Sequence, residues 1–358
     1  MGCPDVPGGP IGAKTDRGEE AMTELTTPKG GTLARMLRRP EAGAVLGLIL
    51  VYVFFASLGG AIFVSAPGWS SWLNTASQVG IIALPVGMLM ISGDLDISVG
   101  SVVPAASLTL AIVSGHYELP AYVGIIAALS AGLLVGFVNG LLVTRTTIPS
   151  LIVTIGTMFA VMGFTLGLTV MIAGSTGLFY VTDPLSKLLL GSAIGGMFQV
   201  GILWWAAFSV VAWSLLHVSP WGNWVFALGG SRESARNAGV ATNRLTIQLY
   251  MMSGFAAAFV GVLQVMTFSG AQVAAGHSFI FNSIMCVVIG GVLLNGGAGS
   301  VIGIVLGTMT FSIVNQGIFF SGLDPNFGSI IIGALLLIAV LSNDSFRAAA
   351  LSYVAKKK

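Results

Sequence analysis

Long apolar runs dominate this 358-residue chain and recur along it from about residue 43 to residue 343. A helix of about 20 apolar residues spans the hydrocarbon core of a bilayer and satisfies its own backbone hydrogen bonds. The runs are unbroken, whereas a membrane β-strand alternates apolar and polar residues over about ten positions. We therefore predict an all-α polytopic membrane protein with about ten transmembrane helices. The expected spans are approximately 43–65, 75–92, 98–115, 121–144, 150–173, 197–217, 246–268, 283–296, 299–320 and 327–343.

Two of these runs depart from the simple pattern. The run at 283–296 is too short to cross a bilayer unaided. Pro85 interrupts the run at 75–92, and proline cannot donate a helical hydrogen bond. We expect a broken or tilted helix at both places.

Composition excludes a soluble protein. Only 8% of the residues are charged, against about 25% in soluble domains, and we expect no nucleic-acid partner. Residues 1–41 mix charges with scattered proline and glycine, which is typical of a flexible polar tail, and Met22 is an alternative start. We predict this N-terminal tail, a transmembrane domain over 42–345, and a basic cytoplasmic C-terminal tail over 346–358.

Basic residues predict the orientation of the chain in the membrane. Loops that face the cytoplasm carry an excess of lysine and arginine. With a cytoplasmic N-terminus, the outer loops receive only Lys187, together with Glu118, Asp183 and Asp324. The cytoplasmic side receives Arg35, Arg38, Arg39, Arg145, Arg232, Arg236, Arg244, Arg347, Lys356, Lys357 and Lys358. An even number of spans places both basic termini in the cytoplasm, in agreement with this distribution.

The segment Gly93–Ser101 places two carboxylates, Asp94 and Asp96, between apolar runs. A charged side chain at bilayer depth costs roughly 2.5–3.5 kcal/mol on insertion scales. Such a cost is tolerated for function or where the segment lies at a membrane face. We expect the preceding helix to end near Ser92, so that both carboxylates reach the cytoplasmic face.

At that face each carboxylate has a different expected partner. Asp96 is predicted to cap the helix that begins near Ser98, because a carboxylate accepts hydrogen bonds from the free N–H groups of a helix N-terminus. Asp94 is predicted to pair with a cytoplasmic arginine, such as Arg236 or Arg145, in one conformational state, since these residues are expected on the same side.

The cytoplasmic segment Gly229–Val240 has the pattern of a short helix. Ser231 can cap its start, and Gly239 can end it in a left-handed conformation. A short charged helix between two spans can dock in a groove of a soluble partner. The alternative is a solvated loop that merely follows the distribution of positive charge, and the residues alone favour neither.

Glycines also form regular patterns. Two stripes of glycine spaced four residues apart let another helix backbone approach closely, which favours packing within the chain over a subunit interface. The cluster Gly296–Ser300 is interpreted as a tight turn rather than a dinucleotide-binding loop, because it lies between apolar runs. The stripes are Gly132, Gly136 and Gly140, and Gly299, Gly303 and Gly307.

Uncharged polar side chains within the spans are candidates for a solute pathway. They can hydrogen-bond a neutral solute or another helix, and both interpretations remain open for each. The candidates are Asn139, Thr154, Thr157, Gln264, Asn315 and Gln316.

Several motifs together resemble one family. Gly93–Ser101 is similar to the G-x-x-D-L-S-V-G-S signature of permease subunits of ribose-type ABC importers, which are binding-protein-dependent transporters of monosaccharides. Gly229–Gly239 resembles the cytoplasmic loop that contacts the ATPase in that family. Matches in the same order follow at Gly270-Ala271-Gln272, Ala275-Gly276, Val288–Gly291 and Gly296–Ser300. The resemblance covers about 43–343, but Asp94, Ile97, Ser231 and Glu233 depart from the family pattern.

The resemblance implies a permease subunit of the bacterial inner membrane that moves a monosaccharide, a polyol or autoinducer-2. It implies two cytoplasmic ATPase subunits, a periplasmic sugar-binding protein, and a second permease copy or relative. ATP and Mg²⁺ belong to the ATPase, and this chain binds no cofactor. The implied ATPase-coupling residues are Gly230, Arg232, Glu233, Ala235, Arg236 and Gly239, of which Glu233 and Arg236 transmit the motion. The family motif supplies Gly93, Asp94, Leu95, Asp96, Ser98 and Gly100.

Two other classes of function are weighed against this one. An ion-gradient-driven secondary sugar carrier needs an ionisable group within a span, and apart from Asp94 and Asp96 the spans hold no Asp, Glu, Lys or Arg. A membrane enzyme needs a catalytic or metal-binding constellation, and no metal-ligand spacing occurs. We therefore predict no catalytic or metal-binding residues.

Overall fold

The computed structural model describes residues 40–180 and 183–322, together with Gly2 and isolated positions between 324 and 337. The chain divides into two units, Met1–Arg39 and Pro40–Lys358, and the following account concerns the second. The predicted tails, 1–41 and 346–358, lie almost entirely outside the described residues, as does most of the predicted span at 327–343.

Eight helices among the described residues are long and apolar enough to cross a membrane. The all-α polytopic fold is thereby confirmed. These helices are α2 (Pro40–Phe63), α3 (Ala66–Ile91), α4 (Val99–Leu110, extended by Ala111–His116), α5 (Ala121–Arg145), α6 (Ser150–Ala173), α8 (Gly201–Trp213, extended by Ser214–Val218), α11 (Thr242–Phe268) and α13 (Val301–Phe320).

The expectation of a short helix that cannot cross unaided at 283–296 is confirmed, whereas the expected break at Pro85 is wrong. The run at 283–296 is not a span of its own, because helix α12 (His277–Ile289) is short and ends before the glycines at 290 and 291, the second of which has φ +84°. Pro85 does not break α3, which is continuous and begins about nine residues earlier than expected, with Pro67 in its first turn.

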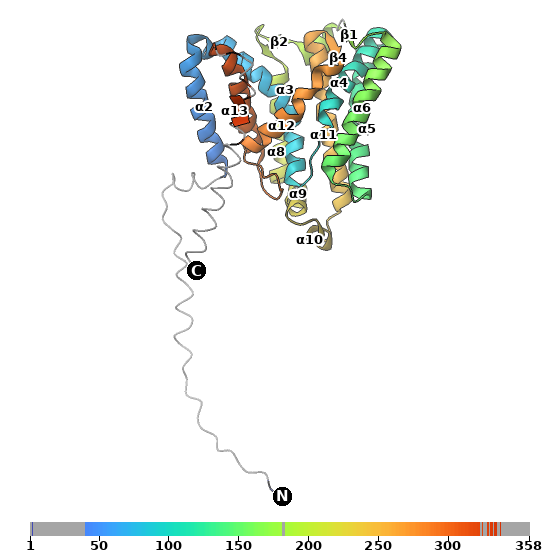
Figure 1. The fold of residues 1–358 in the computed structure, drawn as a ribbon, viewed down its shortest axis with the longest axis vertical. Helices are drawn as coiled ribbons and strands as arrows, with labels where there is room; N and C mark the ends of the chain where they lie inside the picture. The colour runs from blue at the N-terminus through green and yellow to red at the C-terminus, as the bar shows by residue number, and fades with distance from the viewer. Residues whose placement is uncertain are drawn as a thin grey trace. The chain divides into compact units, whose positions relative to one another are not determined.

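The remaining elements connect the spanning helices. The loop between α6 and α8, which the sequence predicts on the outer side, contains β1 (Gly177–Phe179), α7 (Pro184–Ser186), β2 (Ala193–Ile194) and β3 (Phe198–Gln199). Strand β1 pairs antiparallel with β4 (Gly270–Gln272), and β2 pairs with β3. Helices α9 (Pro220–Gly230) and α10 (Arg232–Asn237) lie at the opposite end from β1, β2 and β4 (Figure 1).

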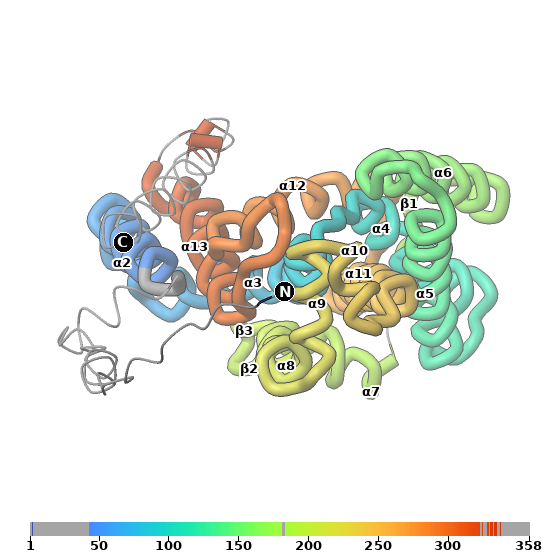
Figure 2. Tube along the Cα trace, turned by 90° about the horizontal axis from the view of Figure 1, so that it is seen from below, coloured from blue at the N-terminus to red at the C-terminus, as the bar shows by residue number. Residues whose placement is uncertain are grey.

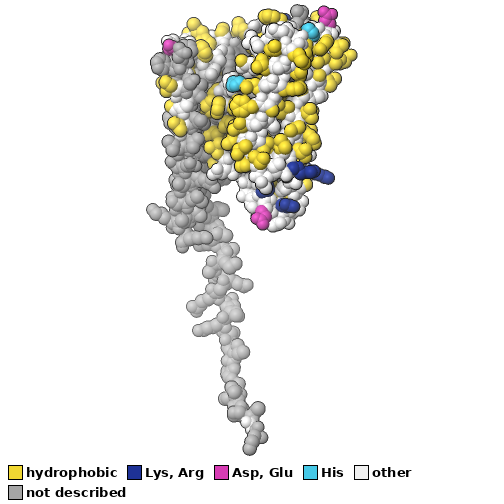
Figure 3. Space-filling model, turned by 45° about the vertical axis from the view of Figure 1, so that its right-hand side comes forward, with side chains coloured by type: hydrophobic (Ala, Val, Ile, Leu, Met, Phe, Trp, Pro, Cys, Tyr) yellow, Lys and Arg dark blue, Asp and Glu magenta, His cyan; other side chains and the backbone are white. Residues whose placement is uncertain are grey.

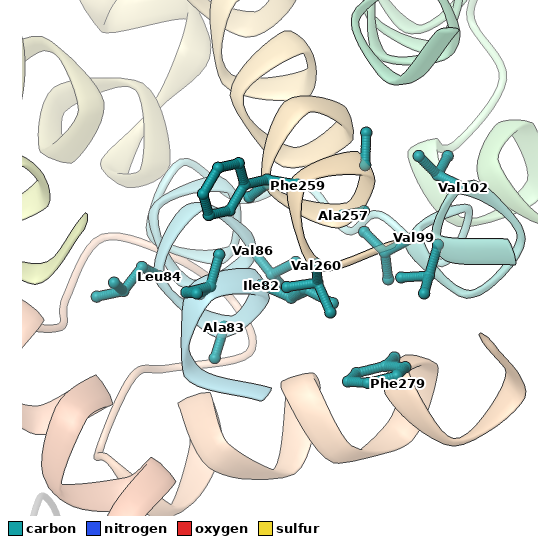
Figure 4. Close-up of a cluster of buried hydrophobic side chains, with 14 of the residues drawn as sticks. Ile82, Ala83, Leu84, Val86, Val99, Val102, Ala257, Phe259, Val260 and Phe279 are labelled. Atoms are coloured by element: carbon teal, nitrogen blue, oxygen red, sulfur yellow. The ribbon is translucent and has the colours of Figure 1, made fainter. Parts of the chain in front are cut away.

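Helices α3 and α11 form the centre of this bundle. Both are mostly buried, whereas α2 and α6 are mostly exposed. Helices α2 and α13 lie at one flank of the bundle and α5 and α6 at the other (Figures 1 and 2). Apolar side chains of α3, α4, α11 and α12 meet between them, including Val86, Val99, Val260 and Phe279 (Figure 4).

The glycine stripes are used for packing inside the chain, as predicted. A Cβ atom at Gly136 would collide with the carbonyl oxygen of Tyr250 in α11, and one at Gly132 would collide with that of Gly254. In the second stripe, a Cβ at Gly307 would collide with the carbonyl oxygen of Cys286 in α12. Close backbone approach of α5 to α11 and of α13 to α12 therefore depends on these glycines.

We predict that Gly136→Ala lowers the thermal unfolding temperature of the purified protein in detergent. The added methyl group meets backbone, and overpacking of this kind costs about 1–3 kcal/mol. Gly47→Ala in α2 is the matched control, because a Cβ there meets nothing within 4 Å. Equal unfolding temperatures for the two variants would contradict the close α5–α11 contact.

Candidate functional site

The connection between α3 and α4, residues 92–98, turns back into the protein instead of leaving it. The N–H groups of Ser92 and Asp94 donate to the carbonyl oxygens of Met88 and Leu89 and close the end of α3. Gly93 makes the turn with φ +89°, a conformation that favours glycine. Helix α3 ends at Ile91, next to the predicted end at Ser92, and Asp94 and Asp96 are buried within the protein, with 7% and 1% of their surface exposed.

Asp96 joins three helices through hydrogen bonds. Its Oδ1 accepts from the backbone N–H of Ser98 at 2.9 Å and from the Ser98 hydroxyl at 2.6 Å, and its Oδ2 accepts from the Ser253 hydroxyl at 2.7 Å. The Nδ2 of Asn139 donates to Ser98 Oγ at 2.8 Å. The predicted capping of α4 is thereby confirmed, and the carboxylate also links α4 to α5 and α11.

Asp94 pairs with Arg232, the first residue of α10, at 2.7 Å between Oδ2 and Nη2. Pairing with an arginine from the side predicted to be cytoplasmic is thus as expected, but the arginine is Arg232 and neither of the two examples, Arg236 and Arg145. Arg232 follows directly after the end of α9, which packs against the end of α3 and brings the guanidinium to the carboxylate. Burial raises the pKa of Asp94, while the positive charge of Arg232 and a hydrogen bond from Ser150 act in the opposite direction.

The ends of α3 and α9 meet through backbone. A Cβ at Gly229 would collide with the carbonyl oxygen of Ile91 and crowd the backbone nitrogen of Gly297. The N–H of Gly297 donates to that same oxygen of Ile91 at 2.8 Å. Gly296 and Gly297 have φ of +80° and +79°, which confirms the predicted tight turn. The role of Gly229 was missed, although its pairing with Gly230 in a loop of charged residues was a visible signal.

Helix α10 forms as its sequence predicts. The hydroxyl of Ser231 accepts from the N–H of Ser234 at 3.2 Å, and Gly239 follows the helix with φ +87°. Ala235 is buried against the bundle, whereas Glu233 and Arg236 are exposed. Lysine and arginine side chains gather at this end of the face shown in Figure 3. The coupling role of α10 remains a prediction.

Three of the six pathway candidates belong to two hydrogen-bonded groups along one polar face of α3, which we together call the amide cluster. Gln316 accepts from Ser71 at 2.7 Å and donates to Thr75 at 2.9 Å and to Asn315 at 3.1 Å. All members are partly buried and lie away from the α10 end of α3. The cluster comprises Ser71, Asn74, Thr75, Gln78, Gln199, Gln264, Asn315 and Gln316.

The other three candidates lie elsewhere. Asn139 belongs to the Asp96 group. Thr154 is fully buried on α6 and bonds mainly to the Ser150 carbonyl oxygen, at 3.0 Å. Thr157 bonds to the Val153 carbonyl oxygen at 3.2 Å and borders a hollow of about 310 Å³ between α5 and α6. The six candidates therefore do not line one path in this conformation.

Similarity to known proteins agrees with this architecture of a helical membrane transporter. The family model described as "Branched-chain amino acid transport system / permease component" matches residues 68–340. The fructose import permease protein FrcC of Rhizobium meliloti is 28% identical over 317 residues, which cover 84% of each chain. A solved structure of PsaBC from Streptococcus pneumoniae aligns at 16% identity with a TM-score of 0.45, too low to establish a shared fold.

Two further relatives are similar over most of their length. The autoinducer 2 import system permease protein LsrD of Salmonella typhimurium is 32% identical over 74% of this chain and 79% of LsrD. The ribose import permease protein RbsC of Escherichia coli K12 is 29% identical over 75% of this chain and 83% of RbsC. The chain belongs to this family of ABC importer permeases, as the sequence motifs indicated. It is a multi-pass protein of the bacterial inner membrane and the permease component, not the ATPase.

We predict that Arg232→Gln destabilises the protein by about 1–3 kcal/mol, because it leaves the buried Asp94 carboxylate without its charged partner. Arg236→Gln, which removes an exposed charge from the same helix, is the matched control and should have little effect.

The unfolding temperatures of the single variants and of Asp94→Asn/Arg232→Gln complete a double-mutant cycle. We expect the double variant to lose less stability than the sum of the single variants, by roughly 0.5–3 kcal/mol. Strict additivity would show that the ion pair contributes no coupling.

Proposed function

We propose that this permease moves a small neutral polyhydroxylated solute, a monosaccharide or related polyol, powered by a separate ATPase subunit that binds ATP and Mg²⁺. A soluble periplasmic binding protein delivers the solute. The observation that carries the substrate class is the amide cluster. Its donors and acceptors match sugar hydroxyls in kind, because an amide can both donate and accept.

The uncharged character of the amide cluster argues for a sugar over an amino acid. An amino acid carries a carboxylate and an ammonium group, and charges that leave water need charged or strongly polar partners. The hydrogen bonds of the cluster in the described part of the chain involve only amides, hydroxyls and backbone groups, such as the Met197 carbonyl oxygen bonded to Asn74. Two of the relatives are named for the import of fructose and ribose.

Weak contacts also suit this mode of transport. Members of the cluster already bond to one another at distances of up to 3.4 Å, as between Gln264 and Gln78. A passing sugar can exchange for these neutral contacts at small net free-energy change, because a typical hydrogen bond contributes only about 0.5–1.5 kcal/mol. Affinity then resides in the binding protein, and the permease releases the sugar readily.

Helix α10 is our proposed contact for the ATPase. It presents Glu233 and Arg236 to solvent, and Arg232 ties its first turn to Asp94. Movement of α10 would therefore pull on the connection between α3 and α4 directly. The backbone of Gly229 packs directly against the carbonyl oxygen of Ile91, which leaves no room for a side chain and gives a second contact with the end of α3.

A second permease copy is our proposed partner at α6. The glycines at 156, 163 and 167 face open space, whereas the space beside the glycines of α5 and α13 is occupied by neighbouring parts of the chain. Helix α6 also exposes large side chains such as Phe159 and Phe164, as α2 does with Leu50 and Phe54. Small residues on an exposed helix face are typical of helix–helix contacts in membranes.

We expect Gly163→Cys to form a disulfide between two copies of the chain in native membranes after mild oxidation. Cross-linked dimer on a non-reducing gel is the measurement, in a Cys3→Ser/Cys286→Ser background that lacks both native cysteines. Gly47→Cys on α2 is the control and should stay monomeric. Equal cross-linking at both positions would contradict the α6 interface.

We predict that Gln316→Leu reduces uptake of the transported sugar by about tenfold, the equivalent of about 1.4 kcal/mol, without loss of expression. Uptake of labelled ribose, fructose and leucine is measured in cells that carry the ATPase and binding protein. Gln248→Leu, an exposed amide outside the cluster, is the control. Leucine uptake that exceeds sugar uptake would overturn the substrate class.

Replacing Glu233 and Arg236 together with alanine should leave folding intact and uncouple transport from ATP hydrolysis. The measurements are co-purification of the ATPase subunit and sugar uptake, and Arg244→Ala supplies an exposed cation outside α10 as control. Unchanged ATPase recovery and uptake in the double variant would rule out α10 as the docking element. Gradient-driven sugar flux through this chain alone would instead favour a secondary carrier.

A further inference from the structure

Asp96 lacks a cationic partner in the described part of the chain. Its side chain is 1% exposed, and the ion pair found among the described residues, Asp94–Arg232, uses the neighbouring carboxylate. Three donor groups, two from Ser98 and one from Ser253, point to the oxygens of Asp96. Burial raises the pKa of Asp96, whereas these three donors act in the opposite direction and favour the ionised carboxylate. The N-terminus of α4 supplies at most about half a positive charge, so the ionised form is left with uncompensated negative charge.

A buried amide oxygen without a hydrogen-bond partner belongs to the same polar group as Asp96. Asn139 is fully buried, and its Oδ1 has no hydrogen-bond partner. The Nδ2 of the same carboxamide bonds to Ser98 Oγ, which bonds to Asp96, so Oδ1 belongs to the same polar group. Exchanging the two amide atoms does not help. Oδ1 would then face a hydroxyl whose proton serves Asp96, and Nδ2 would become the unpaired atom.

We propose that Asp96, Asn139, Ser98 and Ser253 form a binding site for a monovalent cation, with Na⁺ as the probe. One cation meets both requirements, because it neutralises the carboxylate and binds the free amide oxygen. A water molecule would serve Asn139 only, and a proton would serve Asp96 only. The serine hydroxyls can keep donating to Asp96 while their lone pairs face the cation.

The composition of the site selects the class of cation. Hard cations such as Na⁺ are bound by carboxylate, carbonyl and hydroxyl oxygens, whereas transition metals prefer imidazole and thiolate. No group of three or more His, Cys, Asp or Glu side chains occurs in the part of the chain that the structure describes. A single carboxylate among neutral oxygens matches one positive charge.

The proposal adds a structural role for the cation and does not depend on the identity of the sugar. Asp96 and Ser98 lie at the start of α4, Asn139 lies on α5 and Ser253 on α11. A bound cation would hold these three helices together within two residues of the Asp94–Arg232 ion pair. The cation would therefore stabilise the connection at 92–98, to which α10 is joined by the Asp94–Arg232 ion pair.

The test is equilibrium binding of ²²Na⁺ to the full-length protein purified in detergent, with choline as the inert counter-cation. We expect saturable binding of one Na⁺ per chain, and a higher unfolding temperature in Na⁺ than in choline at equal ionic strength. Asp96→Asn should weaken binding by about tenfold or more, a loss of at least about 1.4 kcal/mol. Ser283→Ala, a buried hydroxyl outside the site, should bind Na⁺ normally.

Two results would overturn the proposal. One is the absence of saturable Na⁺ binding to the wild-type protein, including the case in which infrared spectroscopy shows Asp96 protonated instead. The other is equal Na⁺ affinity in the wild type and in Asp96→Asn. If Asp96→Asn does not fold, Ser253→Ala replaces it, and unchanged affinity in Ser253→Ala would count against the site in the same way.

Discussion

Two buried carboxylates in the connection between α3 and α4 organise much of this protein. A charge inside a membrane protein is stable only with partners, and each carboxylate finds them on different helices. Asp94 reaches outward to Arg232 on α10, and Asp96 reaches inward to Ser253 on α11. The short connection thus links α10, which is predicted to face the cytoplasm, to α11 at the centre of the bundle. A rearrangement at α10 must either break these contacts or carry the connection with it.

Backbone contacts make the same region stiff. Gly229 lies against the carbonyl oxygen of Ile91, and Gly136 lies against that of Tyr250. Contacts made through backbone leave no flexible side chain to absorb a displacement, and packed interfaces respond to displacement by switching rather than by deforming gradually. The tight contacts therefore suit the proposed mechanism, in which motion at the α10 end is transmitted to the amide cluster at the other end.

Most of the architecture followed from the sequence because a helix inside the hydrocarbon region is apolar whether it contacts lipid or other helices. Seven of the expected spans correspond to long helices up to α11, and α13 adds an eighth. The late start predicted for α3 has a physical cause. Its first turns carry the polar residues Ser71, Asn74, Thr75 and Gln78, which lower the local hydropathy and form part of the amide cluster. Their spacing of i, i+3, i+4 and i+7 marks one helix face and was available as a signal.

The candidate site was less predictable, since it depends on contacts between distant segments. The capping of α4 by Asp96 is local and was predicted, whereas the pairing of Asp94 with Arg232 depends on how α9 packs against α3. Among the eight arginines predicted on the cytoplasmic side, charge alone could not select the partner. The hydrogen bond from Ser253 to Asp96 joins residues 157 positions apart, and no local pattern indicates it.

The central claim is that motion of α10 is transmitted to the connection at 92–98 through Arg232. Amide hydrogen exchange of this connection, measured in the assembled importer with and without ATP, tests the claim directly. The account predicts that ATP changes exchange at 92–98 in the wild type, and that Arg232→Gln abolishes the change while Arg236→Gln retains it if the ATPase stays bound. Exchange at 92–98 that is insensitive to ATP, or equally sensitive in Arg232→Gln, would contradict it.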